Sequence, residues 1–116
     1  MNKHAMILDD EAGIRHVVGH ILTEQGYRIR SFASPAHAEA DFHPDVIISD
    51  LHMPYRTGLD YIRELHETGK RARHVALMSG DWSHRELEAA NALGCKVFFK
   101  PFPPGLLRAW LSTLPA

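Results

Sequence analysis

The sequence predicts an α/β fold in which a parallel sheet is covered by helices on both faces. Two observations support this prediction. Short apolar runs alternate five times along the chain with segments that have helical periodicity. The runs in the middle of the chain are continuously apolar, which is typical of strands buried on both faces of a parallel sheet. The chain has 116 residues, enough for one domain with a core and too few for two.

Five short runs are the expected strands. They cover residues 4–8, 27–32, 46–49, 74–78 and 96–99. The second run, YRIRSF, alternates apolar and polar residues, so it reads as a half-exposed edge strand. The third and fourth runs, VIIS and HVALM, are apolar almost throughout and are expected at the centre of the sheet.

The segments between these runs are expected to be helices. The first covers residues 12–25, with Ile14, Val17, Val18 and Ile21 on its core-facing side, and Gly26 stops it. The second is a short helix that is capped by Ser34, has Pro35 at its first helical position and runs to about Phe42. The third covers 58–68, and the last covers 104–114 with one apolar face. That face contains Leu106, Leu107, Trp110, Leu111 and Leu114.

The helix over residues 83–93 has a well-marked start. Ser83 and Glu86 have the spacing of a capping box, in which each side chain accepts a hydrogen bond from the backbone of the other residue. Trp82 and Leu87 occupy the two positions of a hydrophobic staple. Trp82 is therefore interpreted first as part of this staple, and a partner-docking role is the alternative.

Composition and charge exclude several functional classes. The formal net charge is −1 and the isoelectric point is about 6.7, so there is no electrostatic footprint for nucleic acid or an anionic membrane. No apolar run is long enough to span a bilayer. Cys95 is the one cysteine, which agrees with a cytoplasmic location. His16 and His20 have a ligand-like spacing, but they are expected to be exposed polar residues because further ligands are missing.

Reactive side chains follow four of the five expected strands. Asp9 and Asp10 come after the first, Asp50 after the third, Ser79 and Asp81 after the fourth, and Lys100 with Pro101 after the fifth. In an open doubly wound sheet, ligands bind outside the carboxyl ends of the strands. These residues are therefore expected to form one site.

The electrostatics of such a site favour a hard cation. Three carboxylates in one small crevice repel each other, and Mg²⁺ removes the conflict because it binds one or two carboxylates and keeps several waters. Lys100 and Ser79 suit the oxygens of a phosphoryl group. Between metal and lysine, Asp50 is positioned as a nucleophile that can form an aspartyl phosphate.

These motifs resemble the receiver domain of two-component response regulators. The matching motifs are Asp9-Asp10, D-L-H-M-P at 50–54 with Gly58 beyond it, M-S-G at 78–80 and K-P-F at 100–102. Each lies where the family has it in the β-α order, and the resemblance covers essentially the whole chain. It implies a (βα)5 flavodoxin-like three-layer sandwich with strand order 2-1-3-4-5. It further implies that residues 1–116 form a single receiver domain with no output domain.

The resemblance implies a role for each site residue. Asp50 is the expected phosphate acceptor, with Mg²⁺ as cofactor. Asp10, Asp50 and the backbone carbonyl of His52 are the expected metal ligands, and Asp9 is expected to act through water. Ser79 and Lys100 are expected to bind the phosphoryl oxygens, and Lys100–Pro101 is expected to be a cis peptide.

The resemblance also implies partners and a means of tuning the signal. His52 and Asp81 occupy the variable positions that set how long the phosphate survives. The expected phosphodonor is a sensor histidine kinase or a phosphotransfer protein, and the signal is expected to pass to an unknown downstream protein or by onward phosphotransfer. The domain is expected to be a monomer or a weak phosphorylation-dependent dimer.

One position departs from the family pattern. Family members usually carry Tyr or Phe three residues before the lysine, and that ring turns inward when the Ser or Thr moves. Here the position is Val97, which has no ring, and strand alternation directs Phe98 to the other face. The usual aromatic switch is therefore expected to be missing.

Two other functions compete with the phosphoacceptor. A phosphorylation-independent binding module with the same fold would explain Val97. A small phosphatase with an Asp nucleophile would be the enzymatic reading, but that class has D-x-D, and here the second acid is replaced by His52. Taken alone, Asp9 and Asp10 could also be solvated acids at a helix start.

Overall fold

The five predicted strands form one parallel sheet in the computed structural model, which describes residues 3–38 and 42–115. In chain order the strands are β1 Lys3–Leu8, β2 Tyr27–Phe32, β3 Val46–Asp50, β6 His74–Ser79 and β7 Lys96–Phe99. Their spatial order is β2-β1-β3-β6-β7. Since β6 and β7 are the fourth and fifth strands of this sheet, the predicted α/β class and the order 2-1-3-4-5 are confirmed.

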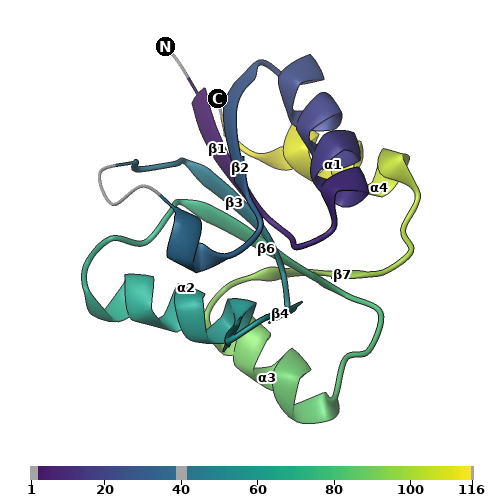
Figure 1. Cartoon of the computed structure of the whole chain (residues 1–116). Coiled ribbons are helices and arrows are strands. Elements are labelled where there is room, and N and C mark those ends of the chain that lie inside the picture. Colours follow the sequence, from purple (N-terminus) through teal and green to yellow (C-terminus); the bar gives the residue numbers. More distant parts are fainter. Residues whose placement is uncertain (1–2, 39–41, 116) are drawn as a thin grey trace.

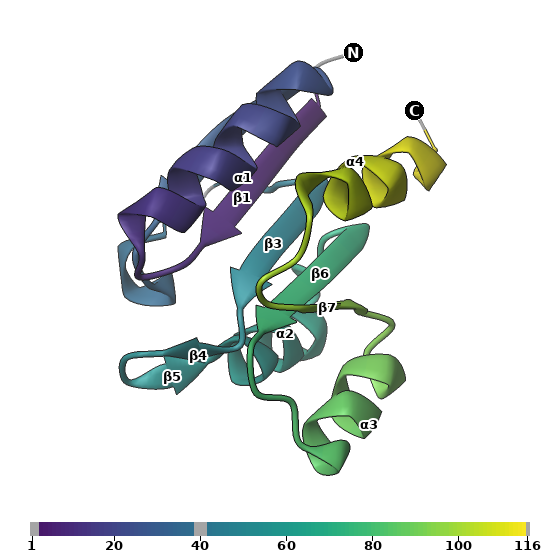
Figure 2. The same ribbon diagram turned by 90° about the vertical axis from the view of Figure 1, so that its right-hand side faces the viewer.

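Helices cover both faces of the sheet and make three layers (Figure 1). Helices α1 Ala12–Glu24 and α4 Pro104–Thr113 lie on one face, and α2 Gly58–Glu67 and α3 His84–Ala92 lie on the other (Figure 2). Within the described ranges, none of these helices has the length and apolarity that a bilayer-spanning helix needs.

Alternation along the strands divides the core into two clusters, one on each face. Ile7 and Ile48 belong to the cluster that packs against α1 and α4, while Met6 and Ile47 belong to the cluster that packs against α2 and α3. All four side chains are at most 2% exposed. The sheet is therefore buried on both faces, which explains the continuously apolar central strands.

The start of α3 is as predicted, and α2 has a cap as well. The Ser83 hydroxyl accepts a hydrogen bond from the Glu86 N–H, and the Glu86 carboxylate accepts one from the Ser83 N–H. The Thr57 hydroxyl accepts from the Asp60 N–H at the start of α2. The staple contact between Trp82 and Leu87 stays a prediction.

The second predicted helix is the main departure from the expected five. It is a short 3₁₀ helix, η1 Pro35–His37, and the backbone at Ala38 is already extended, with φ −70° and ψ 138°. The rest of the predicted segment falls partly on residues 39–41, which lie outside the described residues. Pro44 disfavours helical backbone at His43, so a helix in this segment could not extend beyond Phe42.

Two apolar side chains on the predicted apolar faces of α1 and α4 are exposed. Val17, which the helical pattern directed to the core-facing side, is 48% exposed, so that assignment was wrong. Leu106, on the predicted apolar face of the last helix, is 53% exposed. In each helix the immediately following residue, Val18 or Leu107, is buried. Each exposed side chain lies one position, about 100°, from the buried stripe and reaches only its rim.

A small hairpin that the sequence did not predict follows β3. Its strands are β4 His52–Met53 and β5 Arg56–Thr57, which pair antiparallel. Pro54 and Tyr55 form the two-residue turn, and Tyr55 has φ 70°. The side chain of Tyr55 is fully exposed. The hairpin projects from the carboxyl edge of the sheet and returns the chain to the end of β3, where α2 begins (Figure 2).

Candidate functional site

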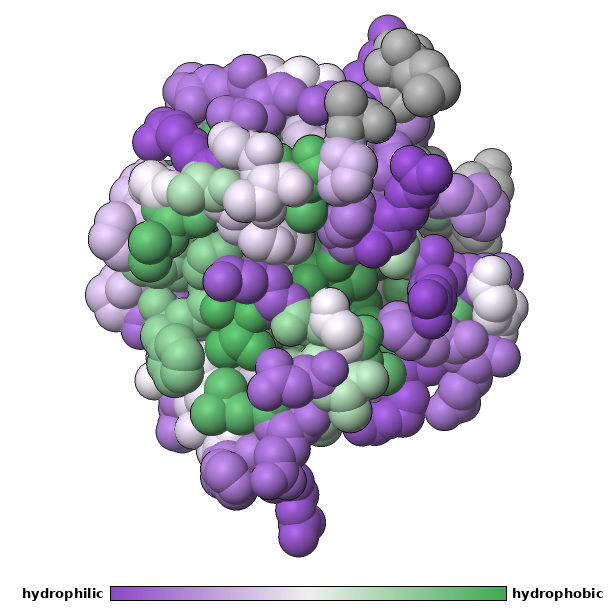
Figure 3. Space-filling view, turned by 180° about the vertical axis from the view of Figure 1, so that it is seen from behind, coloured by the Kyte–Doolittle hydropathy of each residue, from purple (hydrophilic) through white to green (hydrophobic). Residues whose placement is uncertain are grey.

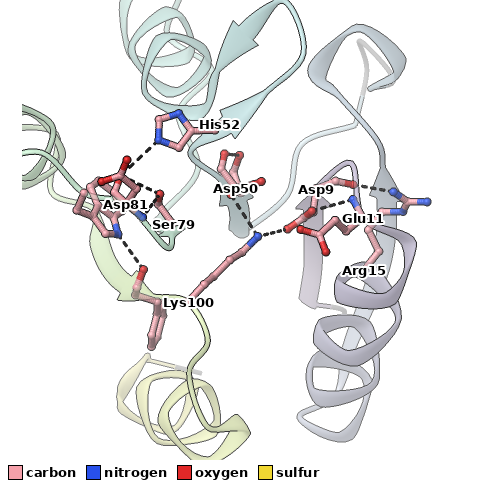
Figure 4. A network of polar contacts seen from close by, with 11 residues as sticks. Asp9, Glu11, Arg15, Asp50, His52, Ser79, Asp81 and Lys100 are labelled. Atoms are coloured by element: carbon pink, nitrogen blue, oxygen red, sulfur yellow. Dashed lines mark hydrogen bonds and ion pairs between the residues drawn. The ribbon is translucent and has the colours of Figure 1, made fainter.

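The predicted site residues meet at the carboxyl ends of four strands. Asp50 ends β3, Ser79 ends β6, Asp9 directly follows β1, and Lys100 directly follows β7. Figure 4 shows the Lys100 side chain reaching between Asp9 and Asp50. Parallel register makes this convergence inevitable, because strands that run the same way end at the same edge.

Lys100 joins the two most buried acids of the site. Its Nζ atom donates a hydrogen bond to Asp9 Oδ2 at 2.9 Å and lies 3.3 Å from Asp50 Oδ1. Asp9 is fully buried, and the Asp50 and Lys100 side chains are 10% and 17% exposed. Both ion pairs are therefore weakly screened by solvent.

A third acid completes a carboxylate cluster. Asp9, Asp10 and Asp50 each offer an oxygen, and these oxygens lie within 4.8 Å of one another. Two backbone contacts hold the Asp9 loop: Asp9 Oδ1 accepts from the Glu11 N–H at 2.9 Å, and Arg15 Nη1 donates to the Asp9 carbonyl at 2.6 Å. Sequence reasoning missed Arg15, whose one signal is its place in the first turn of the helix after the loop.

The cluster perturbs the protonation of both Asp50 and Lys100. Burial and the negative charge of Asp9 raise the pKa of Asp50, although the charge of Lys100 opposes them. Burial alone would lower the pKa of Lys100, but the hydrogen bond to Asp9 and the charges of Asp9 and Asp50 outweigh it and raise that pKa. Asp50 is thus a carboxylate held in a setting that disfavours its own negative charge.

The donor set suits a hard divalent cation. All three oxygens of the cluster come from carboxylates, and Asp10 is exposed, so solvent can complete a coordination shell. A cation would also neutralise the repulsion that raises the pKa of Asp50. Among the described residues this is the one such group of acids, histidines or cysteines. His16 and His20 stay exposed, and His20 pairs with Glu24 at 2.9 Å.

Gly58 makes room for the turn that carries Asp50. A Cβ atom at this position would lie 2.5 Å from the Asp50 carbonyl oxygen and 3.0 Å from Ser49 Oγ. The Gly58 N–H also donates to the Leu51 carbonyl at 2.8 Å, so the start of α2 is held against the end of β3. The glycine is required here by close approach of the backbone.

Ser79 and its neighbours form a second polar group beside the carboxylates. The Ser79 hydroxyl donates to the Asp81 carbonyl at 3.1 Å and accepts from the Asp81 N–H at 3.0 Å. His52 Nε2 lies 3.4 Å from the same carbonyl and 3.9 Å from Glu86 Oε2. The structure therefore turns the Ser79 hydroxyl toward its own loop. The contact between Glu86 and His52 was not predicted, since Glu86 had been assigned only to the cap.

Two further predicted features concern β7 and the residues after it. The Lys100–Pro101 peptide is cis, as predicted. Val97 is partly buried against the α2 and α3 side, whereas Phe98 packs into the opposite cluster. The predicted separation of Val97 from Phe98 is therefore confirmed, and no ring stands at position 97.

The family of the chain follows from comparison with known proteins. The family model described as the response regulator receiver domain matches residues 5–112. The chain belongs to this family. Receiver domains are signalling modules of two-component systems, and the fold described above is that of such a module.

Individual relatives agree with this assignment. The receiver domain is 29% identical over 109 residues to the chemotaxis protein CheY of Thermotoga maritima, covering 90% of each chain. It is 32% identical to the two-component response regulator PhoP of Pseudomonas aeruginosa, and there it spans only 50% of the relative. Chemotaxis protein CheY4 of Vibrio cholerae superimposes with a TM-score of 0.84 at 27% identity, covering 98% of this chain and 100% of that one.

Proposed function

We propose that this receiver domain accepts a phosphoryl group on Asp50 from a phosphohistidine of a sensor kinase or a phosphotransfer protein. The observation that supports this most strongly is the setting of the Asp50 carboxylate. It is nearly buried, lies 3.3 Å from the ammonium of Lys100, and shares a cluster with two other carboxylates. A relative, sporulation initiation phosphotransferase F of Bacillus subtilis, has a name that refers to phosphotransfer and is 24% identical over 106 residues.

The proposed reaction exchanges one bond to phosphorus for another. An Asp50 carboxylate oxygen attacks the phosphorus of the phosphohistidine, an O–P bond forms, and the P–N bond breaks. The released histidine nitrogen keeps the electron pair of that bond. Lys100 balances the negative charge of the phosphoryl oxygens, and Ser79 donates a hydrogen bond to one of them.

Mg²⁺ is the proposed cofactor, held by Asp10, Asp50 and the backbone carbonyl of His52, with Asp9 acting through water. When bound, it would neutralise charge on the carboxylates and on the incoming phosphoryl oxygens. The residues of this chain supply the rest of the site. Arg15 and the Glu11 N–H hold the Asp9 loop, and Lys100 bridges Asp9 and Asp50.

An apolar groove beside the site supports a protein as phosphodonor. It has a volume of about 330 Å³, and it is bounded by α1 and by the segment after β7. Lys100 and Glu11 line its polar end, while Ile14, Val17 and Phe102 line the apolar part. A donor protein seated there would bring its histidine to Asp50. This would give the exposed Val17 a function that the fold does not.

Incubation with Mg²⁺ and acetyl phosphate, followed by intact-mass measurement, tests the acceptor. We expect one phosphoryl adduct on the wild type and none on Asp50→Asn. Asp60→Asn is the matched control, since Asp60 makes its contacts within α2 on an exposed surface. An adduct that persists in Asp50→Asn, or none on the wild type, would overturn the proposal.

The docking groove has a separate test. Val17→Glu places a charge on its apolar wall and leaves Asp50, Lys100 and the carboxylate cluster intact. We expect transfer from a phosphorylated histidine phosphotransfer domain to slow at least about tenfold, the effect of losing about 1.4 kcal/mol of binding. Labelling by acetyl phosphate should stay unchanged. Equal slowing with both donors would contradict docking in this groove.

The two alternatives receive less support. A phosphorylation-independent module has no need of a lysine bonded to a buried carboxylate pair, yet this chain keeps one. A phosphatase needs the second acid that His52 replaces, and family membership favours a signalling module. Within the proposed function, His52 and Asp81 tune the lifetime of the acyl phosphate, and the domain acts in the cytoplasm by changing which protein it docks.

A further inference from the structure

On the face of Val97, the strand β7 has no buried aromatic ring that the loop after β6 could move. Val97 is aliphatic, and Phe98 is 4% exposed within the cluster formed with α1 and α4. Phe99 shares the face of Val97, but it is 58% exposed and lies at the surface. Communication from the site to this edge of the sheet therefore needs a ring from elsewhere in the chain.

Trp82 supplies that ring from the loop between β6 and α3. Its indole Nε1–H donates a hydrogen bond to the Phe98 carbonyl at 3.0 Å. Its ring lies 6.4 Å from the ring of Phe99, with an interplanar angle of 60°. It is partly buried against the same cluster as Val97. Trp82 thus covers the stretch of β7 where Val97 has no ring.

The Ser79 hydroxyl ties the loop that carries Trp82 to the site, beside the longer contact of 3.4 Å between His52 Nε2 and the Asp81 carbonyl. The Ser79 hydroxyl makes both of its hydrogen bonds to Asp81, the residue directly before Trp82 (Figure 4). A serine hydroxyl has a single proton to donate. If it donates to a phosphoryl oxygen on Asp50, it must release the Asp81 carbonyl, and the loop loses this attachment.

Hydrogen bonds and the chain between them form a closed circuit that connects β6 and β7. Ser79 accepts a hydrogen bond from the Lys100 N–H through its own carbonyl at 2.8 Å, so the ends of β6 and β7 are joined. From Ser79 the chain runs through Asp81 to Trp82, and the indole returns to β7 at Phe98. A displacement at Ser79 must therefore change the geometry between Trp82 and β7.

We propose that Trp82 transmits the state of the Asp50 site to the exposed edge of β7, in the place of the ring that position 97 lacks. This inference rests on the proposed function of Asp50. When Ser79 turns to the phosphoryl group, the Asp81–Trp82 segment moves and the indole contact with the Phe98 carbonyl changes. The Phe99 ring, which packs beside Trp82, is then presented differently at the surface.

The test follows one indole N–H resonance. The chain has two tryptophans, so Trp110→Phe leaves Trp82 as the single indole in a ¹H–¹⁵N spectrum. Mg²⁺ and beryllium fluoride, an acyl-phosphate mimic, are then added, and a bound ¹⁹F signal reports occupation of the site. We expect the Trp82 indole peak to shift in step with that signal. In Asp50→Asn neither the bound fluoride signal nor the shift should occur.

Two further variants separate transmission from a general response. Ser79→Ala in the Trp110→Phe background loses one hydrogen-bond donor to the mimic, so its affinity should fall, and beryllium fluoride is raised until the ¹⁹F signal shows an occupied site. At that occupancy the Trp82 peak should stay at its free position. Trp82→Phe leaves Trp110, which contacts Phe98 from the other face at 6.1 Å, and its peak should shift less. Absence of bound fluoride in the wild type sinks the proposed function. Bound fluoride with an unmoved Trp82 peak, a shift that survives Ser79→Ala, or equal shifts at both indoles overturns the role of Trp82.

Discussion

The carboxyl-end pocket around Asp50 and the β7 edge of the sheet lie next to each other, but their side chains differ in polarity and exposure. In the pocket, Asp9, Asp50 and Lys100 are charged, largely buried and held by direct contacts of 2.9 and 3.3 Å. At the edge, Phe99 and Leu106 are apolar and more than half exposed. Figure 3 shows hydrophobic residues gathered on the face seen from behind, where β7 and α4 bound a cavity of about 510 Å³.

The difference reflects what each region can tolerate. A buried charge without a partner costs several kcal/mol, so any change in the pocket has to be matched by its neighbours. An exposed apolar side chain has no such constraint. The following predictions test this contrast, and each compares a change in the pocket or at the edge with a matched change or condition.

Removal of the Lys100 ammonium group has the largest expected effect on stability. Lys100→Met leaves Asp9 and Asp50 buried without their partner, and we expect the free energy of unfolding to fall by about 3 kcal/mol in Mg²⁺-free buffer. Lys96→Met makes the same change at an exposed position on β7 and should alter it by less than about 0.5 kcal/mol. Urea unfolding of both variants measures the free energy of unfolding, and similar losses in the two would contradict the difference between pocket and edge.

Addition of a methyl group at Gly58, close to the Asp50 carbonyl oxygen, has the next largest expected effect on stability. Gly58→Ala brings a Cβ atom to 2.5 Å from the Asp50 carbonyl oxygen, so we expect a loss of about 2 kcal/mol. Gly105→Ala in α4 meets nothing within 4 Å and should be neutral or stabilising by up to about 1 kcal/mol. Thermal unfolding distinguishes the two. A tolerated alanine at Gly58 would show that the turn after β3 can move.

Removal of the Asp50 charge is expected to stabilise the metal-free domain. The pKa of Asp50 is raised by burial and by Asp9, so its contribution to stability is full below the unfolded pKa and is lost as the pH rises through the folded pKa. Asp50→Asn should therefore gain on the order of 1 kcal/mol at neutral pH. The gain should vanish near the ordinary aspartate pKa of 3.8.

Urea unfolding at these two pH values measures the gain from Asp50→Asn, and Mg²⁺ provides the matched comparison. The wild type should be stabilised by Mg²⁺ through mass action, and Asp50→Asn much less so, because one carboxylate ligand is gone. Destabilisation by Asp50→Asn at neutral pH would mean that the attraction of Lys100 outweighs the burial of Asp50.

Truncation at the edge has the smallest expected effect. Leu106→Ala removes a side chain that is 53% exposed, and the free energy of unfolding should change by less than about 0.5 kcal/mol. Leu107→Ala, one residue on and fully buried, should lose about 3 kcal/mol. Denaturant midpoints give both values. A large loss at Leu106 would show that its side chain is packed in the core.

The sequence alone predicted the sheet, the residues that meet at its carboxyl edge and most of the helix starts. Continuously apolar runs predicted the buried strands, and the Ser83–Glu86 spacing predicted the capping box that the structure contains. Charged residues at strand ends predicted which side chains converge, because parallel strands end at one edge. The phosphoacceptor, phosphoryl-binding and metal-binding roles of these residues, the absence of an output domain and the oligomeric state stay predictions.

Tertiary structure decided what local pattern leaves open. Val17 and Leu106 lie one position from a buried stripe, and only the packing of α1 and α4 on the sheet fixes which neighbour is covered. The segment after Pro35 is a short 3₁₀ helix that ends at His37, and the local pattern did not indicate this early end. The indole of Trp82 reaches Phe98, 16 residues along the chain, since β6 and β7 lie side by side. Such contacts between distant residues exist only once the strands have paired.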